Sequence, residues 1–148
     1  MPNFSDFLDR RADEVERPKP LPVGTYRTVI KGQPRFDKST KKGTEFVEFT
    51  HTIVEAADDV DEDALKEYLG DDKLRGKEIK NVYYLTENSL WRVKEFLEHC
   101  GLDVEGKHTL GQLIEGTPNC EVYLTIRHEP SQDGQAMFAR VGGSAAVE

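Results

Sequence analysis

The chain lacks the many cysteines typical of disulfide-stabilised secreted proteins and the long apolar runs typical of membrane proteins. It holds only two cysteines in 148 residues, Cys100 and Cys120, too few for a disulfide framework or a cysteine-rich metal cluster. We expect both to lie in the core as small apolar residues. No apolar run approaches the roughly 20 residues that span a membrane. The N-terminal MPNFSDFLDRR also lacks the apolar centre of a signal peptide. These absences predict a cytoplasmic protein without a membrane partner.

Catalytic signatures are missing as well. The four histidines show no metal-ligand spacing with one another or with the cysteines, and there is no nucleophile elbow. The segment GLDVEGKHT resembles a phosphate-binding loop, but His108 stands where that loop needs a hydroxyl group. We therefore predict a non-enzymatic protein that uses no metal and no cofactor. A metal-dependent nuclease stays as an alternative, because Glu78 and Lys80 share a predicted strand and acids lie upstream.

Charged residues are abundant but unevenly distributed along the chain. The net charge is −8, and residues 55–72 alone hold nine acids and one lysine. Acids and bases are therefore balanced in the rest of the chain. Residues 24–44 hold six bases and one acid, so a basic segment stands apart from an acidic one. In the simplest interpretation both segments are solvated surface, and a binding role needs an argument from the fold.

Residues 1–23 are predicted to form an extension of the main domain. Apolar residues recur at helical spacing between Phe4 and Val15, which predicts a short helix. Prolines at positions 18, 20 and 22 then favour a stiff, extended linker. We expect the helix to serve as a flap, a packing arm or an oligomerisation element. The oligomeric state is left open, with a homodimer as one option.

A long β-hairpin with a basic turn is predicted next. A first strand should run from about Thr25 towards Phe36, with a bend or bulge at Gly32 and Pro34. The turn DKSTKKGT follows, with Gly43 supplying backbone freedom. In the second strand, EFVEFTHTIVE, apolar residues alternate with polar ones.

The remaining elements complete a five-strand order. We expect a short helix around residues 61–69, a strand in GKEIKNVYYLT, a helix in ENSLWRVKEFLEHCGL, another helical turn in TLGQLIEGT, and strands in NCEVYLTIRHE and AMFARV. Residues 143–148 are predicted to be a flexible tail. Three strands, a helix and two strands follow one another in the Greek-key OB barrel. The predicted fold class is thus mainly β with α additions, as one five-stranded OB-fold domain over residues 24–142.

The OB barrel indicates where a ligand would bind. Such barrels bind oligonucleotides on strands 2 and 3 and on the loops L12 and L45, and KSTKKG occupies L12. Single-strand binding uses cations for phosphates and exposed aromatic rings for bases. The predicted phosphate contacts are Arg27, Lys31, Arg35, Lys38, Lys41, Lys42, Arg127 and Arg140. The predicted stacking residues are Phe46, Tyr84 (or its neighbour Tyr83), Tyr123 and Phe138, each with a core position as its alternative. Trp91 is assigned to packing.

A resemblance to a known family points the same way. LPVGTYRTVIKG and STKKGTEFVEFTHTIVE, with GKEIKNVYYLT and SLWRVKEFLEHCGL further on, resemble a family of phage-encoded proteins long catalogued as a domain of unknown function. Its members look like OB-fold single-stranded DNA-binding proteins found beside replication and recombination genes. The resemblance covers residues 21–141. Many such binders end in an acidic tip that docks replication partners, whereas this chain ends VGGSAAVE.

The sequence therefore predicts a sequence-independent single-stranded DNA-binding protein of a phage, acting in replication or recombination in the cytoplasm of the infected cell. The first alternative is an OB-fold interaction module that binds a replication, recombination or host-defence protein. Residues 55–72 are open to three interpretations: solvating surface, a docking site for a replication or recombination protein, or a charge that steers DNA to the basic face.

Overall fold

The structure is a computed structural model that describes residues 8, 12, 19–132, 134 and 136–147. Over these residues the protein is mainly β, with six antiparallel strands in one open sheet and three helices. The strands are β1 (Gly24–Ile30), β2 (Arg35–Lys38), β3 (Glu45–Ala56), β4 (Glu78–Tyr84), β5 (Glu121–Pro130) and β6 (Met137–Ala146). The helices are α2 (Glu62–Leu69), α3 (Leu90–His99) and α4 (Leu110–Glu115). The helix predicted between Phe4 and Val15 falls outside the described residues, apart from residues 8 and 12.

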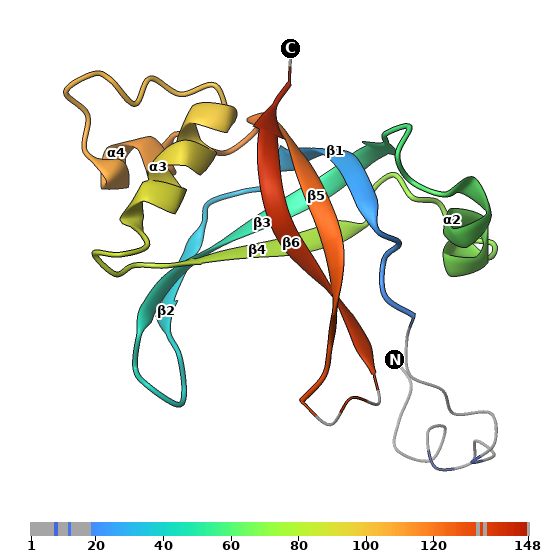
Figure 1. The fold of residues 1–148 in the computed structure, drawn as a ribbon. Coiled ribbons are helices and arrows are strands. Elements are labelled where there is room, and N and C mark those ends of the chain that lie inside the picture. Colours follow the sequence, from blue (N-terminus) through green and yellow to red (C-terminus); the bar gives the residue numbers. More distant parts are fainter. Residues whose placement is uncertain (1–7, 9–11, 13–18, 133, 135, 148) are drawn as a thin grey trace.

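The long strand β3 organises the sheet. Along one edge it pairs with β2 near its start and with β1 near its end, and along the other edge it pairs with β4. The sheet then continues from β1 to β5 and from β5 to β6. β2, β4 and β6 each pair with one strand only, and the described strands include no pairing between β4 and β6. The sheet is therefore open along the facing edges of β4 and β6 (Figure 1).

The predicted first strand is divided into two. β1 ends at Ile30 and β2 begins at Arg35, which raises the strand number from five to six. Gly32 between them has φ +67°, a left-handed conformation that interrupts extended backbone, and Pro34 lacks an N–H group for a ladder hydrogen bond. The bend expected at these two residues is thus confirmed. The hairpin is confirmed too, because β2 pairs antiparallel with β3 and Gly43 in the turn has φ +64°.

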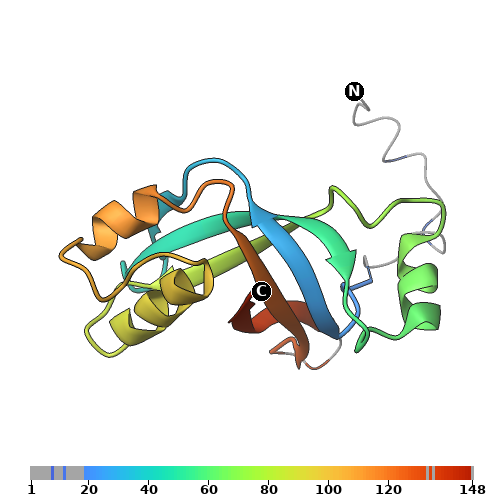
Figure 2. The ribbon, with the colours of Figure 1, turned by 90° about the horizontal axis from the view of Figure 1, so that it is seen from above.

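The core lies on the inward face of this sheet and under α3. Along β3 the alternating residues Val47, Phe49, His51 and Ile53 are buried, as the period-two pattern predicted. α3 covers them with Val93, Phe96 and Leu97, and the Phe49 and Phe96 ring centres lie 4.8 Å apart. α3 and α4 lie together at one end of the sheet, with α2 at the opposite end (Figures 1 and 2). No helix within the described ranges is long and apolar enough to cross a membrane.

The prediction of a flexible tail is wrong for residues 143–146. β6 continues to Ala146 and stays paired with β5, with Gly143, Ser144, Ala145 and Ala146 opposite residues 125, 124, 123 and 122. A register shift between Thr125 and Ile126 lets the strand continue past two glycines. Small residues suggested fraying, but strand pairing depends on backbone groups, which these residues supply as well as larger ones do.

Candidate nucleic-acid interface

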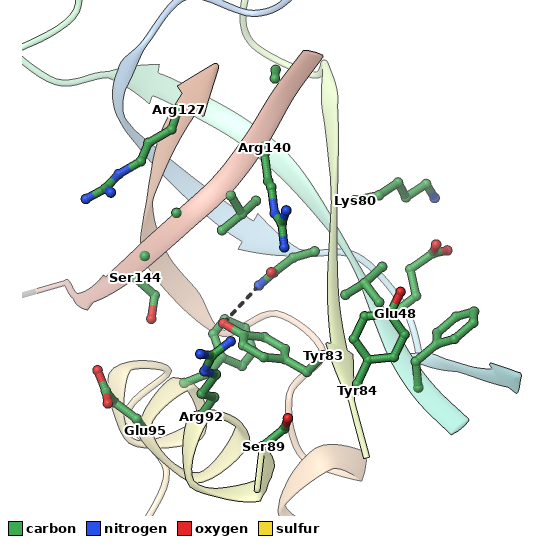
Figure 3. Close-up of a pocket in the computed structure, with 18 of the residues that line it drawn as sticks. Glu48, Lys80, Tyr83, Tyr84, Ser89, Arg92, Glu95, Arg127, Arg140 and Ser144 are labelled. Atoms are coloured by element: carbon green, nitrogen blue, oxygen red, sulfur yellow. Dashed lines mark hydrogen bonds between the residues drawn. The ribbon is translucent and has the colours of Figure 1, made fainter. Parts of the chain in front are cut away.

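A groove of about 910 Å³ lies between the facing edges of β4 and β6, with α3 at one end (Figure 3). Aromatic side chains from three elements line it: Phe46, Tyr83, Tyr84, Trp91 and Phe96. Its charged lining comprises the cations Lys80, Arg92, Arg127 and Arg140 and the carboxylates Glu48, Glu95 and Glu129. The open sheet thus brings aromatic and cationic groups together along one depression.

Tyr84 is the exposed aromatic residue of the β3–β4 wall. It stands opposite Phe46 in the strand register, and the two ring centres lie 6.2 Å apart in an edge-to-face arrangement. The guanidinium carbon of Arg35 lies 5.5 Å from the centre of the Phe46 ring. Phe46 is therefore held by Arg35 and Tyr84, whereas Tyr84 keeps 48% of its surface exposed. Tyr84 is available for stacking and Phe46 supports it. Tyr83 faces the core, where its ring contacts Phe49 and Phe96.

The first turn of α3 supplies a second exposed aromatic ring. Trp91 is 58% exposed and lines the groove, so its assignment to packing was wrong. Because it precedes Val93 by two residues, it points about 200° around the helix from that buried side chain. The guanidinium carbon of Arg92 lies 5.3 Å from the Trp91 ring centre, which is within cation–π range.

Three of the groove cations make no ion pair within the described part of the chain: Lys80, Arg92 and Arg127. Lys80 Nζ donates a hydrogen bond to the Thr50 hydroxyl at 2.7 Å. The stem of Arg127 crosses the backbone of Gly142 so closely that a Cβ on Gly142 would lie 2.6 Å from its Cδ. Because Gly142 has no side chain, the Arg127 side chain can pass over β6 at this position. The fourth cation, Arg140, pairs with Glu129 at 2.8 Å.

A buried polar chain lies beneath the inner wall. The Thr28 hydroxyl donates to the carbonyl of Val122 at 2.8 Å, so its contact with His51 Nδ1 at 3.0 Å must be donated by the histidine. Nε2 of this neutral imidazole then accepts from the Asn81 amide at 3.4 Å. Burial lowers the pKa of His51 to about 4. This chain explains why Asn81 points inward from β4 and leaves Lys80, Val82 and Tyr84 on the outward face.

The end of the groove near α3 is bridged by side chains. The Ser144 hydroxyl of β6 lies 2.7 Å from His99 Nδ1 on α3. Burial raises the pKa of Tyr83, and hydrogen bonds to Asn81 and Ser144 oppose this increase. β6 is therefore tied to α3 through Ser144.

The structure brings four of the predicted site residues together in the groove: Phe46, Tyr84, Arg127 and Arg140. Three cations lie outside it and already pair with carboxylates: Arg27 with Glu121 and Glu55, Lys31 with Glu78, and Arg35 with Asp37 and Glu48. Lys38, Lys41 and Lys42 are exposed at the end of the hairpin. Phe138 is 59% exposed but does not line the groove, and half-buried Tyr123 stands opposite Arg27.

Sequence reasoning missed Lys80, Trp91 and Arg92 as members of the site. For Trp91 and Arg92 a signal was present, because a helical wheel centred on the buried stripe places both away from it. For Lys80 the pattern was ambiguous. Buried Asn81 and outward Val82 reverse the polarity expected of an alternating strand, and only the contact with His51 explains the reversal.

The acidic residues 55–72 have structural partners at several positions. Asp59 accepts hydrogen bonds from the backbone N–H and hydroxyl of Thr25, and these lower the pKa of its carboxyl group. Asp61 caps α2 by accepting from the N–H groups of residues 63 and 64. Glu67 pairs with Lys19 at 2.6 Å. Part of the acidic segment therefore organises the loop and helix that follow β3.

The residues behind the nuclease alternative are engaged with other groups. Glu78 pairs with Lys31 at 3.0 Å, and this hydrogen bond lowers the pKa of the Glu78 carboxyl group. Across the described residues there is no group of three or more His, Cys, Asp and Glu side chains placed to hold a metal ion.

Comparison with known proteins adds no assignment: no protein-family model matches the chain, and no curated protein matches it.

Proposed function

We propose that the protein binds single-stranded DNA in the groove between β4 and β6. One observation carries the proposal: exposed Tyr84 and Trp91 line the same groove as Lys80, Arg92 and Arg127, which make no ion pair within the described ranges. Base stacking on aromatic side chains with nearby cations for phosphates is the general mode of single-strand binding. The DNA would enter over the lysines of the hairpin and continue across Tyr84 towards Trp91.

The strand connectivity supports a finer assignment of the fold. We propose an OB-type fold in which β1 and β2 together correspond to the first barrel strand, and β3, β4, β5 and β6 to the second to fifth. The helix α3 stands between the third and fourth of these strands, as in an OB barrel. On this assignment the hairpin turn is L12 and the β5–β6 turn is L45, and the groove lies where the barrel stays open.

The biological setting rests on the family resemblance of the sequence. We propose that the protein covers exposed single strands during phage replication or recombination and keeps them unpaired. No step of this role requires catalysis.

The test uses the only tryptophan of the chain. Because Trp91 lines the groove, quenching of its fluorescence by oligo-dT would report occupancy of the groove itself. We expect quenching that saturates with oligo-dT, and weak or no quenching by a duplex of the same length. Fluorescence anisotropy of labelled oligo-dT should give the same affinity.

Absence of quenching and of anisotropy change at low salt, with the protein folded, would contradict the proposal. The unpaired edges of β4 and β6 would then favour the interaction-module alternative, since a free strand edge can pair with an extended peptide.

A further inference from the structure

Three carboxylates line the groove, and they differ in their partners. Glu129 pairs with Arg140 at 2.8 Å. Glu48 has a side chain only 19% exposed and lies 3.4 Å from Arg35. Glu95 is exposed and forms no ion pair or hydrogen bond with any described residue. A free carboxylate is unfavourable in a groove that holds phosphates, because like charges repel. Glu95 is better suited to contact a hydrogen-bond donor of the ligand.

The position of Glu95 on α3 defines which part of the ligand it can reach. It follows Trp91 by four residues, so the two side chains are neighbours on one face of the helix, with Cβ atoms roughly 6 Å apart. Arg92 and Glu95 both project from α3 where it borders the groove (Figure 3). Glu95 is also close to the inner wall, since its charge contributes to the raised pKa of Tyr83. A base stacked on Trp91 would have its edge within reach of this carboxylate.

We propose that Trp91, Arg92 and Glu95 form a unit that selects guanine in single-stranded DNA. The base stacks on Trp91, its N1–H and N2–H groups donate to the Glu95 carboxylate, and Arg92 contacts a neighbouring phosphate. The inference rests on the proposed function, and it changes that function in one respect: binding has a base preference at this position of the groove.

Guanine fits because of the donors on its base-pairing edge. N1–H and the N2 amino group lie side by side and can bind both oxygens of one carboxylate, a charge-assisted bidentate arrangement. Cytosine and adenine each offer an amino group beside a ring acceptor, so only one bond can form. Thymine offers N3–H between two carbonyl oxygens, which repel a carboxylate. Unpaired bases expose this edge, and single-strand binders read it by hydrogen bonds.

Three oligonucleotides of equal length separate these possibilities: oligo-dT, an alternating d(TG) repeat, and the same repeat with hypoxanthine in place of guanine. Hypoxanthine differs from guanine only by loss of the N2 amino group. In a Trp91 quenching titration, the affinity for the d(TG) repeat should be roughly tenfold higher than the affinity for oligo-dT. One bidentate contact is sufficient for a ratio of this size. The hypoxanthine repeat should lose most of this advantage.

The matched variants are Glu95→Gln and Glu98→Gln. Both remove one negative charge from an exposed position of α3, but Glu98 does not line the groove. Glu95→Gln should abolish the preference for d(TG), because an amide offers guanine one acceptor oxygen in place of two. It should also raise the affinity for oligo-dT, because a charge that repels phosphate is gone. Glu98→Gln should keep the wild-type ratio.

The outcomes distinguish this inference from the proposed function. Two results would overturn guanine selection and leave single-strand binding intact. One is equal affinity for all three oligonucleotides in the quenching titration, and the other is a preference for d(TG) that survives Glu95→Gln. No quenching by any of them would overturn both.

Discussion

At the scale of single residues, His51 sets how stability depends on pH. The imidazole is fully buried, and burial lowers its pKa from 6.5 to about 4. In the unfolded chain it takes up a proton near pH 6.5, whereas in the folded protein it stays neutral down to about pH 4. Its contribution to stability is therefore complete above pH 6.5 and is lost as the pH falls towards 4.

We expect this loss to be about 3 kcal/mol of unfolding free energy between these two pH values, by the relation between pKa shift and stability. Urea unfolding at a series of pH values would measure it. His51→Gln should remove this part of the dependence of unfolding free energy on pH, which is the slope to be compared, even if the variant is less stable at pH 7. His108→Gln, at an exposed histidine, should leave the slope as in the wild type. A His51→Gln protein with the wild-type slope would show that other groups cause the pH dependence.

Tyr84 and Phe138 form a second test at this scale. Both are exposed aromatic residues on strands, with 48% and 59% exposure, but only Tyr84 lines the groove. Tyr84→Ala should weaken oligo-dT binding by about 1–3 kcal/mol, the range for one stacked base. Phe138→Ala should bind like the wild type in the same anisotropy titration. Equal losses in the two variants would place the DNA outside the groove.

At the scale of elements, the last residues of β6 matter more than their composition suggests. Ser144 contacts His99 of α3, and residues 143–146 pair with β5. Truncation after Gly142 would leave one edge of β5 unpaired at residues 122–125 and would remove the bridge to α3.

We therefore expect this truncation to lower the unfolding free energy by about 2–4 kcal/mol, since each net backbone hydrogen bond contributes about 1 kcal/mol. Chemical denaturation of the truncated and complete chains would measure the difference. Ser144→Ala in the complete chain removes the Ser144–His99 contact but keeps the strand pairing of residues 143–146. This variant should show the smaller part of the loss in unfolding free energy. A truncated chain as stable as the complete one would support the flexible tail that the sequence suggested.

Elements with a strong local pattern were predictable from sequence, whereas their continuity was not. β3 alternates without interruption, and the cap of α2 at Asp61 is a local hydrogen-bond pattern. The bend at Gly32 and Pro34 was predictable from the sequence, but the pairing of β1 and β2 with the same strand β3 depends on contacts across the sheet. The end of β6 depends on β5, a partner supplied by the fold.

At the scale of the whole molecule, ion pairing limits the cationic charge available to the proposed DNA ligand. Arg27, Lys31, Arg35 and Arg140 each pair with a carboxylate. Of the cations in the groove and at the hairpin, six make no ion pair within the described ranges: Lys38, Lys41, Lys42, Lys80, Arg92 and Arg127. The free cationic surface is therefore smaller than the count of basic residues in the sequence implies.

Each phosphate contact on a single strand contributes about 0.7 to the slope of log K against log salt concentration. Six contacts predict a slope no steeper than about −4 for oligo-dT. Changing Lys38, Lys41 and Lys42 together to Ala should flatten it by about 2. The control changes Lys66, Lys73 and Lys107, exposed lysines outside the groove, together to Ala. This control should leave the salt slope as in the wild type. A much steeper slope in the wild type would mean that the paired arginines leave their carboxylates to bind DNA.

The sequence by itself determined the mainly β composition, the basic hairpin, the helix between β4 and β5, and the buried face of β3, because each depends on local periodicity or turn chemistry. Only the tertiary structure decided which charges and rings form a site. Carboxylates distant in the chain neutralise Arg27 and Lys31, while the buried contact of Asn81 with His51 turns Tyr84 outward. The open edges of β4 and β6 then bring Tyr84 and Trp91 into one groove. These outcomes depend on contacts between distant segments, which no local pattern specifies.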